Sequence, residues 1–414
     1  MCQRALIYKG ELIMKGVEIK YADVCIGALF GAYRQLLQMT FGEALSETRY
    51  GKGDTKGFDA SVESGIKKCL GDFNGEEIVL ITEETDDVTS RVWPIDPNPK
   101  QQPKMFFSDP VDRSKYLEQI INLMAKKLFP DDDSGENAKK RSNIKVAELL
   151  MHEDIVKLWD KEVDAPASIT GATAAITYVN RGRVIFSVIL NFITRDIYVA
   201  CDIGIKSVRI DKDFKNIPTK DPLEYIMREG REIVFPSAME RSLVDDDLNN
   251  FVTFLGKDMY KEIFVESGIV PGDYKKFIHH DRPGGPSRVL YLSDLQPKEA
   301  PVGFILANGE KIGEWMHWLP FVKFARNFSG NPALRLYEVS LKKALFKNDI
   351  LVSTPPAYSI FNCRDEKKYI DVSIMKNHAQ PSRFRSMLVI ASSDNERIGP
   401  LMDRFEYRDV GMCL

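Results

Sequence analysis

The sequence lacks the cysteine spacings that mark a disulfide framework or a structural zinc site. No two of its six cysteines form a CxxC pair, and they are scattered as Cys2, Cys25, Cys69, Cys201, Cys363 and Cys413. Isolated cysteines of this kind are typical of free thiols in a reducing compartment. We therefore expect a soluble, non-secreted protein of the cytoplasm.

The chain also lacks a dominant charge and a long apolar run. Its 57 basic and 60 acidic residues leave a formal charge of −3, so we expect no general polyanion-binding surface and no nucleic-acid partner. No uninterrupted apolar run is long enough to cross a bilayer, so we expect no membrane partner. What is present is 414 residues, 44% of them hydrophobic, which is enough for a substantial globular core.

Apolar periodicity predicts two helices and a short strand near the start of the chain. The spacing predicts helices over 21–41 and 59–70. Residues 78–81 form a β-prone run that is followed directly by Glu83 and Glu84. Both glutamates would then lie at the carboxyl end of a buried strand, where open α/β sheets bind ligands.

A second acidic motif, FSDPVDRS at 107–114, follows the next predicted strand. Asp109 and Asp112 stand three positions apart with a proline between them, an arrangement that suits hard divalent cations and a positioned water. Helical spacing over 117–128 places Ser114 near a helix start, where free N–H groups and the helix dipole favour an anion. The pattern indicates a metal site with a phosphate beside it.

The remaining patterns are less specific. Residues 129–165 are charge-rich, and we expect an exposed loop that re-enters a helix over 146–159. Runs at 172–179, 184–192 and 196–201 predict consecutive antiparallel strands. The WPIDP segment at 93–97 and the His279-His280-Asp281 triplet lack a partner at ligand spacing, and we interpret both as loops.

Taken in order, these motifs resemble the inositol monophosphatase superfamily of magnesium-dependent, lithium-sensitive phosphatases. The matching residues are Thr55, Asp59, Glu63, Glu83, Glu84, Asp109, Pro110, Val111, Asp112, Ser114 and the strand 197–200. The resemblance covers 55–114 and 170–204, is weak over 205–384 and returns near 385–405. It implies an α/β fold, an α+β sandwich with layered αβαβα architecture and insertions. We expect three parts: an N-terminal α+β metal-site domain (1–204), an insertion (205–384) and the start of a C-terminal α/β domain (385–414).

The resemblance also implies the ligands of the metal. Carried over position by position, it makes Glu83, Asp109 and Asp112 side-chain ligands of Mg²⁺. The backbone carbonyl of Val111 would complete the turn, and Glu84 would assist at the metal cluster. Oxygen ligands of this type are those that Mg²⁺ prefers.

The implied activity is hydrolysis of a small phosphomonoester by a metal-activated water. Glu83 and Ser114 would orient the water, with Asp59 hydrogen-bonded to Ser114. The backbone N–H groups of Arg113 and Ser114 would bind the phosphate. An inositol, sugar or nucleotide phosphate would be the substrate, and a homodimer is common in the family.

Two departures from the family pattern leave alternatives open. Arg113 stands where the family usually has glycine, and it either restricts the backbone or adds a guanidinium to the phosphate pocket. The family's later Trp-Asp metal ligand has no counterpart before the sequence ends at Leu414, and Trp159-Asp160 is in the wrong order. The chain is then either an active phosphatase, with a carboxylate such as Asp245, Asp246 or Asp247 as a replacement, or a weakened member that binds a phosphorylated ligand or protein partner.

Overall fold

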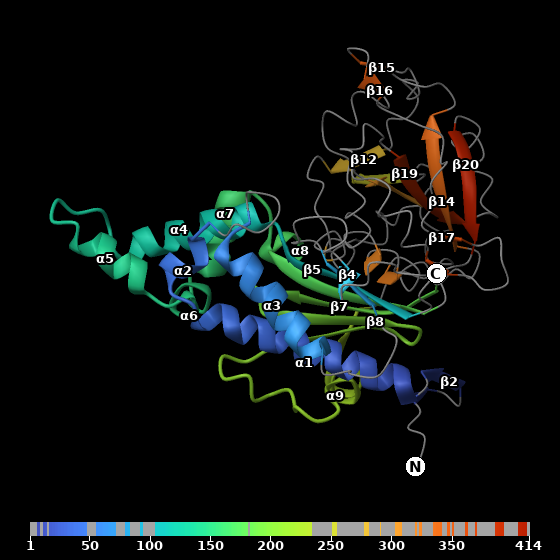
Figure 1. Ribbon diagram of the computed structural model, residues 1–414, viewed down its shortest axis with the longest axis horizontal. Coiled ribbons are helices and arrows are strands. Elements are labelled where there is room, and N and C mark those ends of the chain that lie inside the picture. Colours follow the sequence, from blue (N-terminus) through green and yellow to red (C-terminus); the bar gives the residue numbers. More distant parts are fainter. Residues whose placement is uncertain are drawn as a thin grey trace, which may run out of the picture.

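The computed structural model describes the first half of the chain almost continuously and the second half in short segments. The described residues are 6–8, 11–14, 16–47, 55–71, 79–82, 92–93, 104–180, 183–233, 251–254, 277–280, 290, 303–308, 319–320, 323–324, 334–341, 346–347, 350–351, 361–362, 369–370, 386–392 and 405–411. Figure 1 shows how their elements are arranged. Among these residues no helix combines the length and apolarity needed to cross a bilayer.

An eight-stranded sheet forms the centre of the first half. Its order is β10-β9-β8-β7-β6-β5-β3-β4, and only the β3–β5 pair is parallel. The strands are β3 (Val79–Thr82), β4 (Val92–Trp93), β5 (Lys104–Asp112), β6 (Thr173–Asn180), β7 (Arg183–Asn191), β8 (Asp196–Cys201), β9 (Gly204–Arg209) and β10 (Arg231–Glu232). The predicted run of consecutive antiparallel strands is confirmed in β6, β7 and β8.

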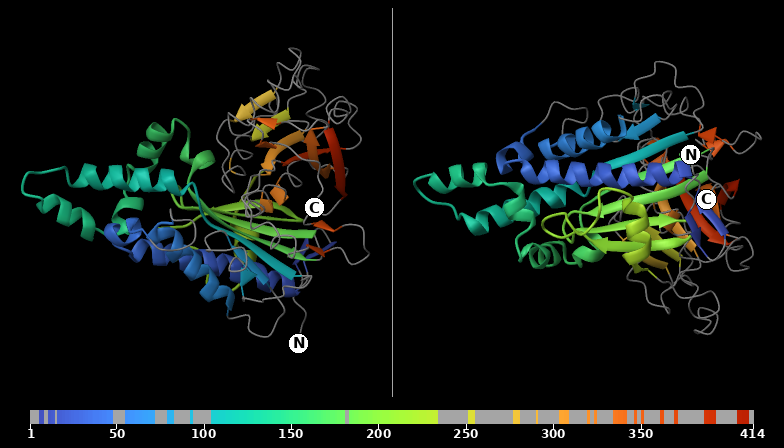
Figure 2. Two further views of the ribbon diagram at one scale, coloured as in Figure 1. Left: turned by 45° about the horizontal axis from the view of Figure 1, so that its top comes forward. Right: turned by 90° about the horizontal axis from the view of Figure 1, so that it is seen from below.

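Helices cover one face of this sheet. α1 (Gly16–Gln38) and α3 (Gly57–Gly71) pack against each other, and the short α2 (Phe41–Leu45) and α9 (Pro222–Glu229) lie beside them. Figure 2 shows these helices on one side of the sheet and the strands of the second half on the other. The buried ring of Tyr21 on α1 contacts the rings of Phe106 and Tyr178 edge-on, at centroid distances of 5.8 and 5.0 Å. The predicted mixed α/β class, with helices packed on an antiparallel sheet, is confirmed.

Five helices follow β5. They are α4 (Ser114–Leu128), α5 (Glu136–Asn143), α6 (Val146–Leu150), α7 (Ile155–Val163) and α8 (Ala167–Thr170). Figure 1 shows α4 and α5 extending away from the sheet while α8 lies beside β5. The prediction of a helix after Ser114 is confirmed by α4.

The charge-rich segment was only partly predicted. Part of the expected loop forms α5, none of whose residues is buried. Its charges stabilise the helix instead of preventing it, because Lys140 and Glu136 lie one turn apart with their charged atoms at 2.7 Å. The helix expected over 146–159 is broken between α6 and α7, where the backbone N–H of Asp154 donates to Nδ1 of His152 at 3.1 Å.

A six-stranded sheet lies in the second half of the chain. Its order is β12-β11-β13-β19-β14-β20, with β11 (Phe251–Phe254), β12 (Phe277–His280), β13 (Gly303–Asn308), β14 (Leu334–Leu341), β19 (Ser386–Ser392) and β20 (Phe405–Gly411). The predicted strand near 385–393 is β19. Small two-stranded pairs complete the described elements: β1 (Leu6–Tyr8) with β2 (Glu11–Met14), β15 (Phe346–Lys347) with β16 (Ile350–Leu351), and β17 (Phe361–Asn362) with β18 (Tyr369–Ile370).

Strand pairing crosses both boundaries of the predicted three-part division. Across the boundary at 204, β9 and β10 continue the first sheet, and across that at 384, β19 lies between β13 and β14. An ion pair also joins the two halves, because the fully buried ammonium of Lys323 contacts the partly exposed carboxylate of Asp202 and donates to the carbonyl of Val184 on β7 at 3.3 Å. The division itself stays a prediction.

Candidate metal and phosphate site

The two aspartates of the DPVD motif lie inside β5, not in a turn after it. The register against β6 pairs Asp109 with Ala175 and Asp112 with Thr173. The two aspartates are three residues apart on β5, whereas their partners are two residues apart on β6. This offset is a β-bulge, and a bulge is one of the few places where a proline such as Pro110 fits inside a sheet. The expected turn was therefore wrong in detail, because β6 pairs with both sides of the motif.

The bulge puts both carboxylates on the same face of the sheet. Side chains alternate along a regular strand, so residues three apart would point to opposite faces. Ala175 and Thr173 are two apart on β6 and share a face, and their cross-strand partners Asp109 and Asp112 share it with them. This is the face away from α1, because Phe106, which contacts Tyr21, lies an odd number of positions before Asp109.

Both carboxylates are shielded from solvent. Asp109 is 0% exposed and Asp112 is 8% exposed. Burying an ionised carboxylate is costly unless hydrogen bonds or positive charge compensate it. Two such groups on one face, at the end of a strand, are typical of a functional site and not of a packing core.

The chain turns sharply directly after Asp112. Arg113 has a left-handed backbone (φ 65°, ψ 36°), and α4 begins at the next residue, Ser114. The Nη1 atom of Arg113 donates to the carbonyl of Thr170 on α8 at 2.7 Å. Part of the guanidinium is thus engaged with α8. Both alternatives for Arg113, a restricted backbone and a guanidinium in the phosphate pocket, stay predictions.

Asp59 lies in the first turn of α3 and is 3% exposed. One of its carboxylate oxygens accepts the backbone N–H of Lys56 at 3.1 Å, which helps to cap the helix. Glu63, one turn later, is equally buried and pairs with Lys67 at 2.8 Å. The expected hydrogen bond between Asp59 and Ser114 stays a prediction.

Polar side chains continue across the sheet on the face of Asp109 and Asp112. Thr177 and Ser187 are both fully buried, and their hydroxyl oxygens lie 2.8 Å apart. Thr173, opposite Asp112, is also fully buried. Sequence reasoning missed Thr173, because a single threonine in a β-prone run carries no signal until the cross-strand register is known.

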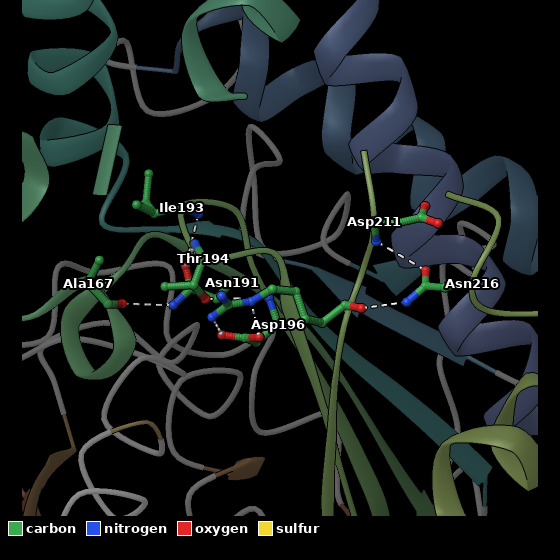
Figure 3. Close-up of polar contacts among 8 residues, drawn as sticks. Ala167, Asn191, Ile193, Thr194, Asp196, Asp211 and Asn216 are labelled. Atoms are coloured by element: carbon green, nitrogen blue, oxygen red, sulfur yellow. Dashed lines mark hydrogen bonds and ion pairs between the residues drawn. The ribbon is translucent and has the colours of Figure 1, made fainter. Parts of the chain in front are cut away.

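Asn191 on β7 is the next residue across from Thr173 and is fully buried. Figure 3 shows its amide between α8 and the turn after β7. Its Nδ2 donates to the carbonyl of Ala167 at 2.8 Å, while its Oδ1 accepts the N–H groups of Ile193 (2.9 Å) and Thr194 (3.1 Å). Asn191 therefore holds backbone in place, and both of its functional atoms are used for that purpose.

Several of the predicted site residues lie outside the part of the chain that the structure describes. Glu83 and Glu84 lie outside the described residues, as do Asp245, Asp246 and Asp247. Within the described segments no three His, Cys, Asp or Glu side chains come together as a metal site. The roles proposed for Glu83, Glu84 and the carbonyl of Val111 stay predictions, and the Val111 side chain is buried in the hydrophobic core.

Trp159-Asp160, which had the wrong order for the family motif, has a structural role. The Nε1 atom of the fully buried Trp159 donates to the hydroxyl of Thr170 at 3.0 Å, and the carboxylate of Asp160 accepts the N–H of Ala167 at 2.6 Å. These bonds tie α7 to α8. Both side chains are thus used in helix packing.

No protein-family model matches the sequence, and a comparison with curated proteins finds no match. Among solved structures, the chain is similar to CysQ from Bacteroides thetaiotaomicron, a bacterial member of the inositol monophosphatase family (11% identity, 91% of this chain and 98% of that chain covered, TM-score 0.44). It is also similar to an inositol monophosphatase from Anabaena (10%, 93% and 96%, TM-score 0.43) and to the extragenic suppressor protein suhB from Bartonella henselae (13%, 77% and 86%, TM-score 0.39). The CysQ and Anabaena structures are of the inositol monophosphatase family, which is the family that the sequence motifs resemble.

Proposed function

We propose that the protein is a magnesium-dependent phosphomonoesterase that acts on a small phosphorylated metabolite. The observation that carries the proposal is the bulge in β5, which brings the buried Asp109 and Asp112 to one face immediately before the start of α4. Location in the cytoplasm and assembly as a homodimer stay predictions.

The residues at this place fit a divalent cation. Two buried carboxylates on one face supply hard oxygen donors, and the resemblance adds Glu83 and Glu84. Glu83 follows Thr82 directly in the sequence, and Thr82 is the parallel-strand partner of Ser108, the residue before Asp109. When bound, Mg²⁺ would lower the pKa of a coordinated water and polarise the phosphate.

The start of α4 supplies the groups for a phosphate. The first N–H groups of a helix have no acceptor within the helix, and among the described residues no side chain caps α4. The N–H groups of Arg113 and Ser114, together with the positive end of the helix dipole, would therefore bind phosphate oxygens. The half-buried Ser114 would orient the attacking water, and the left-handed Arg113 stands between Asp112 and this helix start.

A second candidate is a phosphate-binding protein with weakened catalysis. It follows from the alternative that the sequence leaves open, because the predicted further ligands Glu83 and Glu84 lie outside the described residues and no third His, Cys, Asp or Glu side chain joins Asp109 and Asp112 within them. Loss of one carboxylate from a metal cluster weakens both metal affinity and water activation. The two candidates share the phosphate site and differ in turnover.

Phosphate release from a panel of inositol, sugar and nucleotide phosphates, with and without magnesium, separates the candidates. We expect magnesium-dependent release by the natural protein and a fall of at least about 100-fold in Asp109→Asn, which keeps the shape of the side chain but removes its charge. Asp213→Asn is the matched control, because Asp213 lies in a surface pair with Lys215. That variant should keep full activity.

The outcome of the panel decides between the two candidates. Absence of release from every compound, with an intact circular dichroism spectrum, would overturn the enzyme proposal. Calorimetric binding of the same phosphates would then support the second candidate. Absence of binding as well would overturn both.

A further inference from the structure

The hydroxyl of Thr173 is a buried polar group that packing does not explain. The residue is 0% exposed, and its Oγ1 has no hydrogen-bond partner among the described residues. A buried hydroxyl without a partner destabilises the folded protein relative to one that is hydrogen-bonded. Valine has nearly the same shape without this cost, so the presence of a hydroxyl here calls for a functional reason.

The surroundings of Thr173 restrict what its hydroxyl can bind. On β7 its neighbour is Asn191, whose Oδ1 already accepts two backbone N–H groups and whose Nδ2 donates to Ala167. On β5 its neighbour is Asp112. Directly opposite residues in an antiparallel pair have Cβ atoms about 4.5–5.5 Å apart, within reach of a hydrogen bond after a side-chain rotation. The carboxylate of Asp112 is therefore the acceptor that the sheet register presents to Thr173.

Other buried hydroxyls near the site do not share this position. Thr82 and Ser108 are also buried without a hydrogen-bond partner among the described residues. They are strand partners two positions after Leu80 and Phe106, and so they face the helices. Thr177 is on the same strand and the same face as Thr173, but its hydroxyl is bonded to Ser187. Thr173 alone among these four is the cross-strand partner of a predicted ligand.

We propose that Thr173 is a positioning residue for the metal site, and this inference rests on the proposed function. Its hydroxyl donates to the Asp112 oxygen that does not hold the cation. Such a bond fixes the orientation of a ligating carboxylate, and loss of a comparable outer hydrogen bond typically lowers metal affinity by about 10- to 100-fold. The cost of the buried hydroxyl in the metal-free protein is then offset when metal binds.

The test compares Thr173→Val, Thr173→Ser and the matched control Thr177→Val. Magnesium affinity is measured by calorimetry, and the thermal midpoint is measured without metal. We expect Thr173→Val to bind magnesium at least about 10-fold more weakly, with a thermal midpoint equal to or above that of the natural protein. Thr173→Ser keeps the hydroxyl and should restore most of the affinity.

Thr177→Val should show the opposite pattern. It removes the partner of the buried Ser187 hydroxyl, so the thermal midpoint should fall while magnesium affinity stays unchanged. Unchanged magnesium affinity in Thr173→Val, while Asp112→Asn abolishes binding, would overturn the role of Thr173 and leave the proposed function intact. If the natural protein itself binds no magnesium, the proposed function fails and the role of Thr173 fails with it.

Discussion

The two faces of the eight-stranded sheet are built from alternate residues of the same strands, yet they have different tasks. Toward α1 the sheet presents rings, with Phe106 and Tyr178 against Tyr21. On the other face, near the end of β5, it presents the buried carboxylates of Asp109 and Asp112. Apolar burial stabilises the fold, whereas buried carboxylates oppose it. One strand therefore supplies stability from one face and the candidate chemistry from the other.

The bulge at Pro110 makes this division possible. A regular strand would have given one aspartate of the motif to each face, and Asp112 would have pointed into the apolar layer. With the bulge it is Val111 that joins the hydrophobic core. The spacing of the two aspartates in the sequence therefore shows which face they share only when the bulge in the strand is known.

The largest expected effect is on the helix-facing side. Phe106→Ala should lower the free energy of unfolding by about 3–5 kcal/mol, because it leaves a cavity among aromatic rings. Asp109→Asn, on the opposite face, should change stability by less than about 1 kcal/mol or raise it, because it removes a buried charge. Urea unfolding of both variants gives the comparison, and equal losses of stability would contradict the division between the faces.

A smaller loss of stability is expected from breaking the ion pair between Asp202 and Lys323, which joins the two halves of the chain. Asp202→Ala should cost about 3 kcal/mol, since it takes a partner from the fully buried ammonium of Lys323. Lys323→Met, which removes the charge at similar volume, should be near neutral. Thermal unfolding of the two single variants and the double variant measures the coupling.

The reactivity of the Cys201 thiol reports on the structure next to the ion pair between Asp202 and Lys323. Burial raises the pKa of its thiol to about 11, so the thiol should react slowly with a thiol reagent at neutral pH. Faster modification in Asp202→Ala than in Lys323→Met would agree with loosening near Asp202. Equal and slow modification in both variants, with equal stability, would show that the ion pair contributes little.

Much of the first half could be predicted from the sequence. The periodicity of α1, α3 and α4 and the alternation of β6, β7 and β8 are local patterns, and each element lies close to its predicted range. The position of β19 between β13 and β14 could not be predicted, because pairing between distant strands leaves no local signal. The same limit explains why α5 was expected as a loop, since its stability comes from charge pairs on an exposed surface.

For the candidate site, the residue types were predictable and the geometry was not. Asp109, Asp112 and Ser114 follow from chemistry and spacing. The shared face of the two aspartates depends on register against β6, and so does the position of Thr173 opposite Asp112. The anchoring of Arg113 depends on Thr170, which lies 57 residues away in the sequence.

The smallest expected change in the free energy of unfolding is at Arg113, where the chain passes from β5 to α4. Arg113→Ala loses the hydrogen bond to Thr170 and keeps a side chain in the left-handed conformation, and we expect a loss of about 2 kcal/mol. Arg113→Gly loses the same bond but relieves the backbone, so it should be about 1 kcal/mol more stable than the alanine variant. Urea unfolding of both variants measures this difference.

The same two variants separate the roles that the sequence left open for Arg113. If the side chain only anchors the turn to α8, phosphate release by Arg113→Gly should stay within about 3-fold of the natural protein, because the N–H groups of α4 remain in place. If the guanidinium also binds phosphate, both variants should raise KM together by about 10-fold or more, whatever their stability. If the alanine variant is as stable as the glycine variant, the left-handed backbone at position 113 carries no strain. The contribution of Arg113 at this turn would then come from its guanidinium.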